Sequence, residues 1–305
     1  MSREKPLNLL TLKNTTIKSF IESFDTVIVS IDGVIWTQTH TIDNSQESIT
    51  SFRQIGKKLF FLANTSSKTR EEIVGRAHNE GFDLLKEEML TSPYLAAEYL
   101  KEIRFEKKIF VIGSEGLLKE LASAGFEYVG YGPGPFINSS LNIHTDPLVG
   151  AVLIGLDQHL SYQKLLSASA YLSNPAILFL ACNSDDSVSF NETLKVPGAG
   201  CIVKALERCT QRTAHIIGKP NRFAADFLMK NYKLDAEKTL VIGDGLNTDI
   251  LFGTRCGFQT LLVLTGVTKL EDVEKLLKSK TKEDKDLIPD FYIESIGHLV
   301  NILNL

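Results

Sequence analysis

The sequence predicts an α/β fold with a parallel sheet, and two features of the chain carry this prediction. Short, continuously apolar runs alternate with segments of helical periodicity along nearly the whole chain. Continuously apolar strands are typical of parallel strands that are covered on both faces, and such alternation is typical of strand–helix–strand units with right-handed crossovers. The 305 residues exceed what one typical core needs, so we expect two domains.

Eight apolar runs are expected to form strands, at residues 26–31, 58–63, 108–113, 150–156, 176–183, 214–218, 239–244 and 260–266. Helical patterns lie between them, at residues 45–56, 93–103, 161–173 and 201–211. Two segments rich in glycine, proline and polar residues are expected to be loops, at 130–147 and 191–200. The stretch 279–303 is expected to form a mobile loop, a short strand and a closing helix.

Composition excludes several partners. The chain carries 37 acidic and 33 basic residues, which gives no electrostatic reason to bind nucleic acid or an anionic membrane surface. No apolar run reaches the length of a membrane span and no signal peptide is visible, so we expect a soluble, cytoplasmic protein. The four cysteines form no CxxC pair or metal-ligand spacing, and we expect buried free thiols (Cys182, Cys201, Cys209 and Cys256).

Four polar stretches each begin at the end of an apolar strand, at residues 30–36, 62–71, 218–221 and 242–257. In a doubly wound sheet the carboxyl ends of the strands converge on one crevice. We therefore expect these loops to meet, although they lie far apart in the sequence.

The four stretches supply the groups that a phosphate site needs. Asp32 offers a carboxylate, and Gly33 lets the backbone turn tightly. Lys219 offers a positive charge before a proline. A run of amide and hydroxyl donors is expected at a helix N-terminus, which suits a phosphate (Asn64, Thr65, Ser66 and Ser67). Asp244 and Asp249 add carboxylates at a strand end, and such hard oxygen ligands beside a phosphate suit Mg²⁺.

The ordered set of motifs resembles one family. The stretches that carry the likeness include residues 31–36, 196–200, 217–223, 243–253 and 261–268. They are similar to haloacid-dehalogenase-superfamily phosphatases of the subgroup with 4-nitrophenylphosphatase, phosphoglycolate phosphatase and pyridoxal phosphatase. The resemblance runs from about Phe24 to Leu305. It implies a Rossmann-like core at residues 1–87 and 213–305, with an α/β cap inserted at 88–212.

The resemblance carries over at part of the site only. It implies that Asp32 is the general acid and base and that Lys219 is a charge clamp, beside the phosphate contacts expected of Gly33 and residues 64–66. It also implies that Asp244 and the main-chain carbonyl of Asp32 bind Mg²⁺, with Asp249 behind them through water.

The resemblance fails at the nucleophile. The family's first motif is Asp-x-Asp-Gly, and its first aspartate position is Ser30 here. Ala63 stands where the family carries a phosphate-binding Thr or Ser, and Gly245 stands where its fourth motif carries a basic residue. A serine hydroxyl is essentially un-ionised and needs an adjacent base. No histidine lies beside the four motifs, and His215, the nearest in sequence, is expected to face the core or the cap.

Three functions remain open from the sequence. The first is a catalytically impaired homologue that binds small phosphorylated metabolites, with weak Mg²⁺ affinity because Ser30 adds no charge. The second is an active Mg²⁺-dependent phosphomonoester hydrolase, acting on phosphoglycolate, pyridoxal phosphate or an aryl phosphate through Ser30 or a water held by Asp32. The third is a non-catalytic structural partner, for example one that dimerises through the cap.

Overall fold

The computed structural model describes residues 5–133, 143–189, 194–279 and 281–304. The chain divides into two compact units. The first unit comprises Met1–Ala63, Val74–Leu90 and Lys219–Leu305, and the second comprises Asn64–Ile73 and Thr91–Gly218. The predicted cap boundaries at 88 and 212 stay a prediction, because compactness alone does not say which unit acts as a cap.

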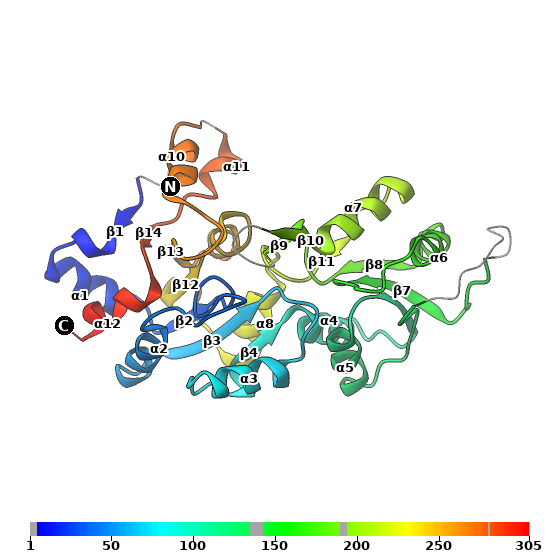
Figure 1. Cartoon of the computed structure of the whole chain (residues 1–305), viewed down its shortest axis with the longest axis horizontal. Coiled ribbons are helices and arrows are strands. Elements are labelled where there is room, and N and C mark those ends of the chain that lie inside the picture. The colour runs from blue at the N-terminus through cyan, green and yellow to red at the C-terminus, as the bar shows by residue number, and fades with distance from the viewer. Residues whose placement is uncertain (1–4, 134–142, 190–193, 280, 305) are drawn as a thin grey trace. The chain divides into compact units, whose positions relative to one another are not determined.

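A seven-stranded sheet forms the centre of the first unit, in the order β1-β14-β13-β12-β2-β3-β4 (Figure 1). The strands are β1 (Leu7–Asn8), β2 (Thr26–Val29), β3 (Lys58–Ala63), β4 (Met89–Thr91), β12 (Thr239–Gly243), β13 (Gln259–Val263) and β14 (Phe291–Ile293). The pairs from β1 to β3 are parallel, and Val27 lies opposite both Leu240 and Leu59. Every residue of β2 and β12 is buried, as the continuous apolar runs predict.

Helices of the first unit follow its strands in the chain. They are α1 (Asn14–Glu22), α2 (Ser45–Gln54), α8 (Phe223–Tyr232), α9 (Leu251–Cys256), α10 (Leu270–Leu277), α11 (Lys282–Lys285) and α12 (Leu299–Leu303), with short 3₁₀ turns at Leu9–Thr11, Lys86–Glu88, Ala236–Lys238 and Ile296–His298. A π-helical turn, η4 (Leu246–Ile250), joins β12 to α9. Helix α3 (Arg70–Asn79) begins in the second unit and ends in the first.

The second unit is built on a five-stranded parallel sheet, in the order β11-β8-β7-β5-β6. Figure 1 labels β7, β8 and β11 of this sheet. Its strands are β5 (Lys108–Ile112), β6 (Tyr128–Val129), β7 (Val149–Ile154), β8 (Leu178–Ala181) and β11 (His215–Ile216), beside an antiparallel hairpin of β9 (Ser187–Ser189) and β10 (Lys195–Pro197). Its helices are α4 (Ser92–Glu102), α5 (Glu115–Ser123), α6 (Tyr162–Leu172) and α7 (Ala199–Thr210). Tyr171 of α6 and Leu206 of α7 pack with Val152 and Phe179 of the sheet in one apolar core.

The predicted elements agree with the structure except in the loops. Each of the eight segments predicted as strands contains a strand of the structure, and each segment predicted as a helix contains a helix. The predicted loop at 191–200 is wrong in its described part, because β10 pairs with β9 there and α7 starts at Ala199. The loop expected after residue 279 contains helix α11, whose N-terminus is capped by the Thr281 side chain. Residues 134–142 of the predicted loop at 130–147 lie outside the described residues.

Two further findings bear on the sequence expectations. No helix in the described part of the chain is long and apolar enough to cross a membrane. All four cysteines are free, but Cys201 and Cys209 are exposed, so the expectation of buried thiols holds only for Cys182 and Cys256. Cys201 and Cys209 lie on α7, whose apolar face is made by other residues of that helix.

Candidate active site

The carboxyl ends of β2 and β12 place Ser30 and Asp244 at the same edge of the first unit's sheet. The two strands are parallel neighbours, and the N–H of Ser30 donates to the carbonyl of Ile242 at 2.8 Å, one step beyond β2. Asp244 follows directly after β12. Both side chains are buried, with 7% of each residue exposed. The prediction that polar groups at these strand ends converge therefore holds for this pair.

The ammonium group of Lys219 lies at the centre of this edge. Its Nζ donates to the Oγ of Ser30 at 2.9 Å, to the carbonyl of Leu62 at 2.8 Å and to the Oδ1 of Asp249 at 2.6 Å. Only 4% of the Lys219 side chain and 2% of the Asp249 side chain are exposed. A buried ammonium is tolerated when an opposite charge and further acceptors satisfy it. Asp249 thus balances the charge that Lys219 brings beside Ser30.

Asp249 is itself held by the π-helical turn η4. Its Oδ2 accepts hydrogen bonds from the backbone N–H groups of Asp244 at 3.2 Å and Gly245 at 3.0 Å. The carbonyl of Gly245 in turn accepts from the N–H of Asp249 and of Ile250. Because both carboxylate oxygens of Asp249 have donors, this side chain fixes Lys219 from one side and the start of the turn from the other.

Asp244 is enclosed by two glycines. Its Oδ2 accepts a hydrogen bond from the N–H of Val267 at 2.8 Å. A Cβ atom at Gly33 would lie 2.5 Å from that oxygen, and one at Gly266 would lie 1.9 Å from it. Gly33 also has a φ of +79°, which favours glycine. The tight turn predicted at Gly33 is confirmed, whereas Gly266 and Val267 were not predicted as parts of the site, although residues 261–268 carry the family likeness.

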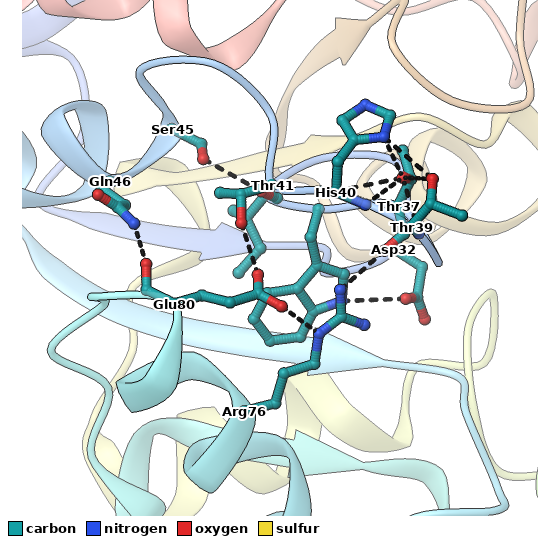
Figure 2. Close-up of polar contacts among 11 residues, drawn as sticks. Asp32, Thr37, Thr39, His40, Thr41, Ser45, Gln46, Arg76 and Glu80 are labelled. Carbon is teal, nitrogen blue, oxygen red and sulfur yellow. Dashed lines mark hydrogen bonds and ion pairs between the residues drawn. The ribbon is translucent and has the colours of Figure 1, made fainter.

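Asp32 lies on the loop that follows β2, and its carboxylate accepts a hydrogen bond from an indole. The Nε1 of Trp36 donates to the Oδ1 of Asp32 at 3.1 Å (Figure 2). The backbone closes the same turn, since the N–H of Gly33 donates to the carbonyl of Trp36 at 2.7 Å. The hydroxyl of Thr265 donates to the carbonyl of Gly33 at 2.6 Å. Trp36 is a further residue that the sequence motifs did not assign to the site.

The predicted phosphate donors fall in a different unit. Ala63 ends β3 in the first unit, whereas Asn64, Thr65 and Ser66 belong to the second. There the amide of Asn64 donates to the carboxylate of Asp185 at 3.3 Å, and the Oγ of Ser66 accepts from the N–H of Leu156 at 2.8 Å. Their phosphate-binding role stays a prediction.

The helix N-terminus expected at residues 64–67 is wrong. Helix α3 begins at Arg70. Thr69 and Glu72 form a reciprocal cap, in which the N–H of each residue donates to the other's side chain, at 2.8 Å and 3.1 Å. This cap sets the start of the helix beyond the predicted donors. His215 stacks on Tyr99 of α4, with the ring centroids 5.0 Å apart, in the second unit.

Comparison with known proteins decides the family. Residues 27–127 match the family model of haloacid dehalogenase-like hydrolases, and residues 216–298 match a second, HAD-hydrolase-like model. The chain is 36% identical over 298 residues to the glycerol-3-phosphate phosphatase of Homo sapiens, covering 94% of this chain and 93% of that protein. The chain belongs to the haloacid dehalogenase-like hydrolases.

Other members of this family support the same assignment. The chain is 36% identical to phosphoglycolate phosphatase 2 of Arabidopsis thaliana over 302 residues, 96% of this chain and 97% of that protein. The structure of a p-nitrophenyl phosphatase from Archaeoglobus fulgidus superposes with a TM-score of 0.78 at 28% identity, covering 92% of this chain and 99% of that one. The resemblance drawn from the motifs is thus confirmed, and so is the α/β, Rossmann-like fold that it implies.

The oxygen donors of this haloacid dehalogenase-like site suit a weak Mg²⁺ site. Among the described residues, no group of three His, Cys, Asp or Glu side chains is placed to hold a metal ion. Asp249 has both oxygens engaged, and the Oδ2 of Asp244 accepts from the N–H of Val267, which leaves the Oδ1 of Asp244 as a carboxylate ligand at the end of β12. Mg²⁺ is commonly bound through one or two carboxylates together with phosphate oxygens. The donor set fits an ion that depends on a bound phosphate.

Burial also affects the ionisation of Asp244. Burial, and then the nearby charge of Asp249, raise the pKa of Asp244 well above its ordinary value, to about 7. A carboxyl whose pKa is higher in the folded state destabilises the fold as it ionises, since the unfolded chain loses the proton first. The cost starts near the unfolded pKa of about 4 and is complete above about pH 7.

Asp244→Asn is therefore expected to stabilise the protein at high pH in the absence of divalent cations. The asparagine amide oxygen keeps the acceptor for Val267 N–H without the buried charge. Thermal melts with chelator at about pH 5 and about pH 8 should show a fall in the wild-type midpoint that the variant lacks. An equal fall in both proteins would show that Asp244 does not carry the pH dependence.

Proposed function

We propose that this chain binds a small phosphorylated metabolite at the carboxyl ends of β2 and β12, and that it hydrolyses this ligand slowly at most. The observation that carries the proposal is the contact between Lys219 Nζ and Ser30 Oγ at 2.9 Å, because the group presented to the ammonium is a hydroxyl and not a carboxylate. The names of the relatives, which specify glycerol 3-phosphate and phosphoglycolate, support a small phosphomonoester as the ligand class.

The residues take distinct roles in this proposal. Asp32 would serve as general acid and base, and Lys219 would balance the charge of the phosphoryl group. Mg²⁺, held by the Asp244 carboxylate and the main-chain carbonyl of Asp32, would add positive charge at the phosphoryl oxygens. Asp249 would keep Lys219 in place. Further phosphate contacts would come from Gly33 and residues 64–66.

The environment of Ser30 explains why turnover would be slow. A serine attacks phosphorus only when a base removes its proton. The ammonium of Lys219 is paired with Asp249 at 2.6 Å, so it donates a hydrogen bond to Ser30 and does not take up the proton. A hydroxyl is also shorter than a carboxylate, and a misplacement of about 1 Å can cost ~10²-fold in rate.

An active phosphomonoester hydrolase is the second candidate, and two observations favour it. The relatives described above are named as phosphatases. The contact between Ser30 and Lys219 also joins the two residue types of serine–lysine catalytic dyads. Substrates of this candidate would be phosphoglycolate, pyridoxal phosphate or an aryl phosphate. A cytoplasmic location, and a structural role through a homodimer of the cap, remain predictions.

Steady-state hydrolysis of 4-nitrophenyl phosphate tests the proposal. Highly purified protein is assayed with and without Mg²⁺, at several protein concentrations so that a contaminating phosphatase is recognised. We expect a rate near background that Ser30→Ala leaves unchanged. Turnover on the order of 1 s⁻¹ that is abolished by Ser30→Ala would make Ser30 a working nucleophile and establish the second candidate.

Calorimetry tests the binding half of the same prediction. Inorganic phosphate should bind the wild-type protein, and Mg²⁺ should bind more tightly when phosphate is present, because one carboxylate is a poor site by itself. Tight Mg²⁺ binding without any anion would contradict the proposed site. No phosphate binding under either condition would favour the structural role.

A further inference from the structure

The single tryptophan of the sequence contacts the carboxylate of Asp32. Trp36 is 2% exposed, and a buried indole N–H needs an acceptor. It has one in the Oδ1 of Asp32, at 3.1 Å. Isolated β-bridges pair Trp36 with Asp32 on one side and with Thr41 on the other. Backbone bridges to Asp32 and to Thr41 thus hold the residue that carries the indole.

The face of the Trp36 indole ring is covered by an arginine that forms an ion pair. The guanidinium of Arg76, on α3, lies 4.3 Å from the centroid of the Trp36 ring. Its Nε donates to the Oε1 of Glu80 at 2.6 Å, and its Nη2 donates to the carbonyl of Thr37 at 2.8 Å (Figure 2). A cation over an indole face is an attractive arrangement, and more so when it is partly desolvated. Two hydrogen bonds fix Arg76, so it restrains the ring it covers.

The network continues beyond the ion pair. The hydroxyl of Thr41 donates to the Oε2 of Glu80 at 2.7 Å, and the side-chain amide of Gln46 donates to the carbonyl of Glu80 (Figure 2). Phe82 packs its ring edge against Trp36, with the centroids 6.0 Å apart. The charged side chains of Arg76 and Glu80 are 22% and 25% exposed. A continuous set of contacts therefore runs from Asp32 to the edge of solvent.

We propose that Trp36 is a positioning residue that fixes the orientation of the Asp32 carboxylate, and that Arg76 and Glu80 hold the indole for this purpose. The terminal torsion of an aspartate side chain is broad, so a carboxylate without a fixed donor samples many orientations. A neutral N–H selects one orientation and adds no charge at the phosphate site. This inference rests on the proposed role of Asp32 as general acid and base.

The first arm of the test uses the indole N–H as a spectroscopic probe. Because the chain has one tryptophan, the ¹H–¹⁵N correlation spectrum of the ¹⁵N-labelled protein contains a single indole cross-peak. Asp32→Asn should move this peak strongly, and Arg76→Gln should move it as the ring loses its restraint. Phe82→Leu, which changes the packing of the ring but keeps its N–H donor, should move it less. An indole cross-peak whose position does not change in Asp32→Asn would overturn the proposal.

The second arm measures turnover in the Ser30→Asp protein. Adding Trp36→Phe keeps an aromatic ring but removes the donor, and should lower kcat by about tenfold or more with little change in KM, since a misplaced catalytic group can cost up to ~10²-fold. Phe82→Leu is the matched packing control and should leave kcat unchanged. Equal losses in the two variants would show that Trp36 acts through packing only. If Ser30→Asp restores no turnover, the structural role is favoured over the proposed function, while the indole peak still decides this inference.

Discussion

Ser30→Asp is expected to raise the turnover of 4-nitrophenyl phosphate by at least ~10²-fold over the wild-type protein. The new carboxylate would supply a nucleophile that is ionised at neutral pH. It would also lie beside the Lys219 ammonium, which now donates to the Ser30 hydroxyl at 2.9 Å, and would form a stronger, charge-assisted hydrogen bond with it. With Asp244 next to it at the same strand ends, it would add a second carboxylate for Mg²⁺.

Two further variants make this result specific. Ser30→Asn introduces a side chain of nearly the same size as aspartate but without its charge. The turnover of this variant should stay near background. Ala63→Thr, added to Ser30→Asp, should raise turnover further by restoring a hydroxyl donor at the end of β3. The two gains should not be additive, because both groups act on one phosphoryl group. No gain in Ser30→Asp or in the double variant would mean that other parts of the site have changed, and would favour the structural role.

Lys219→Met is expected to lower the free energy of unfolding of the first unit by about 3–5 kcal/mol. Methionine has a similar length, so the loss comes from the charge. Removing the ammonium leaves the 2%-exposed carboxylate of Asp249 buried without its cation. Urea unfolding followed by tryptophan fluorescence measures this change selectively, because Trp36 lies in the first unit.

A matched ion pair and a double variant control for other effects. Lys238 pairs with Asp25 at the surface of the first unit, with side chains 59% and 65% exposed, so Lys238→Met should change stability by no more than about 1 kcal/mol. Combining Lys219→Met with Asp249→Asn should cost less than the sum of the single variants, because the second change removes the unpaired charge. A loss for Lys219→Met no larger than that for Lys238→Met would contradict the buried pair.

The sequence was sufficient for the fold because the decisive signals are local. Eight continuously apolar runs formed strands, and parallel pairing then brought Ser30 and Asp244 to one edge. Resemblance to the phosphatases supplied the family, which the comparisons confirmed. The motif at 242–257 also contains Asp249, although its actual partner, Lys219, lies 30 residues earlier in the chain.

What the sequence could not supply depends on tertiary contacts. Nothing in the motif at 30–36 indicates that the Trp36 indole turns back to Asp32, or that Arg76 of α3 covers its ring. The start of α3 was misplaced because threonine and serine residues at 65–69 all suit a cap, and only the reciprocal bonds of Thr69 and Glu72 select one. Nothing in the sequence indicates that Gly266 packs against the Asp244 carboxylate.

Gly33 and Gly266, the two glycines around Asp244, are constrained by packing and not by catalysis. A Cβ atom at Gly266 would lie 1.9 Å from the Oδ2 of Asp244, and a Cβ atom at Gly33 would lie 2.5 Å from it. These positions are therefore constrained by the packing of the fold, whether or not the protein turns over a substrate. At position 30 a hydroxyl satisfies the contact with Lys219, so that contact does not require a carboxylate. A chain released from selection for catalysis would lose its nucleophile early and keep these glycines long afterwards, so that an intact glycine pattern is poor evidence of an intact enzyme.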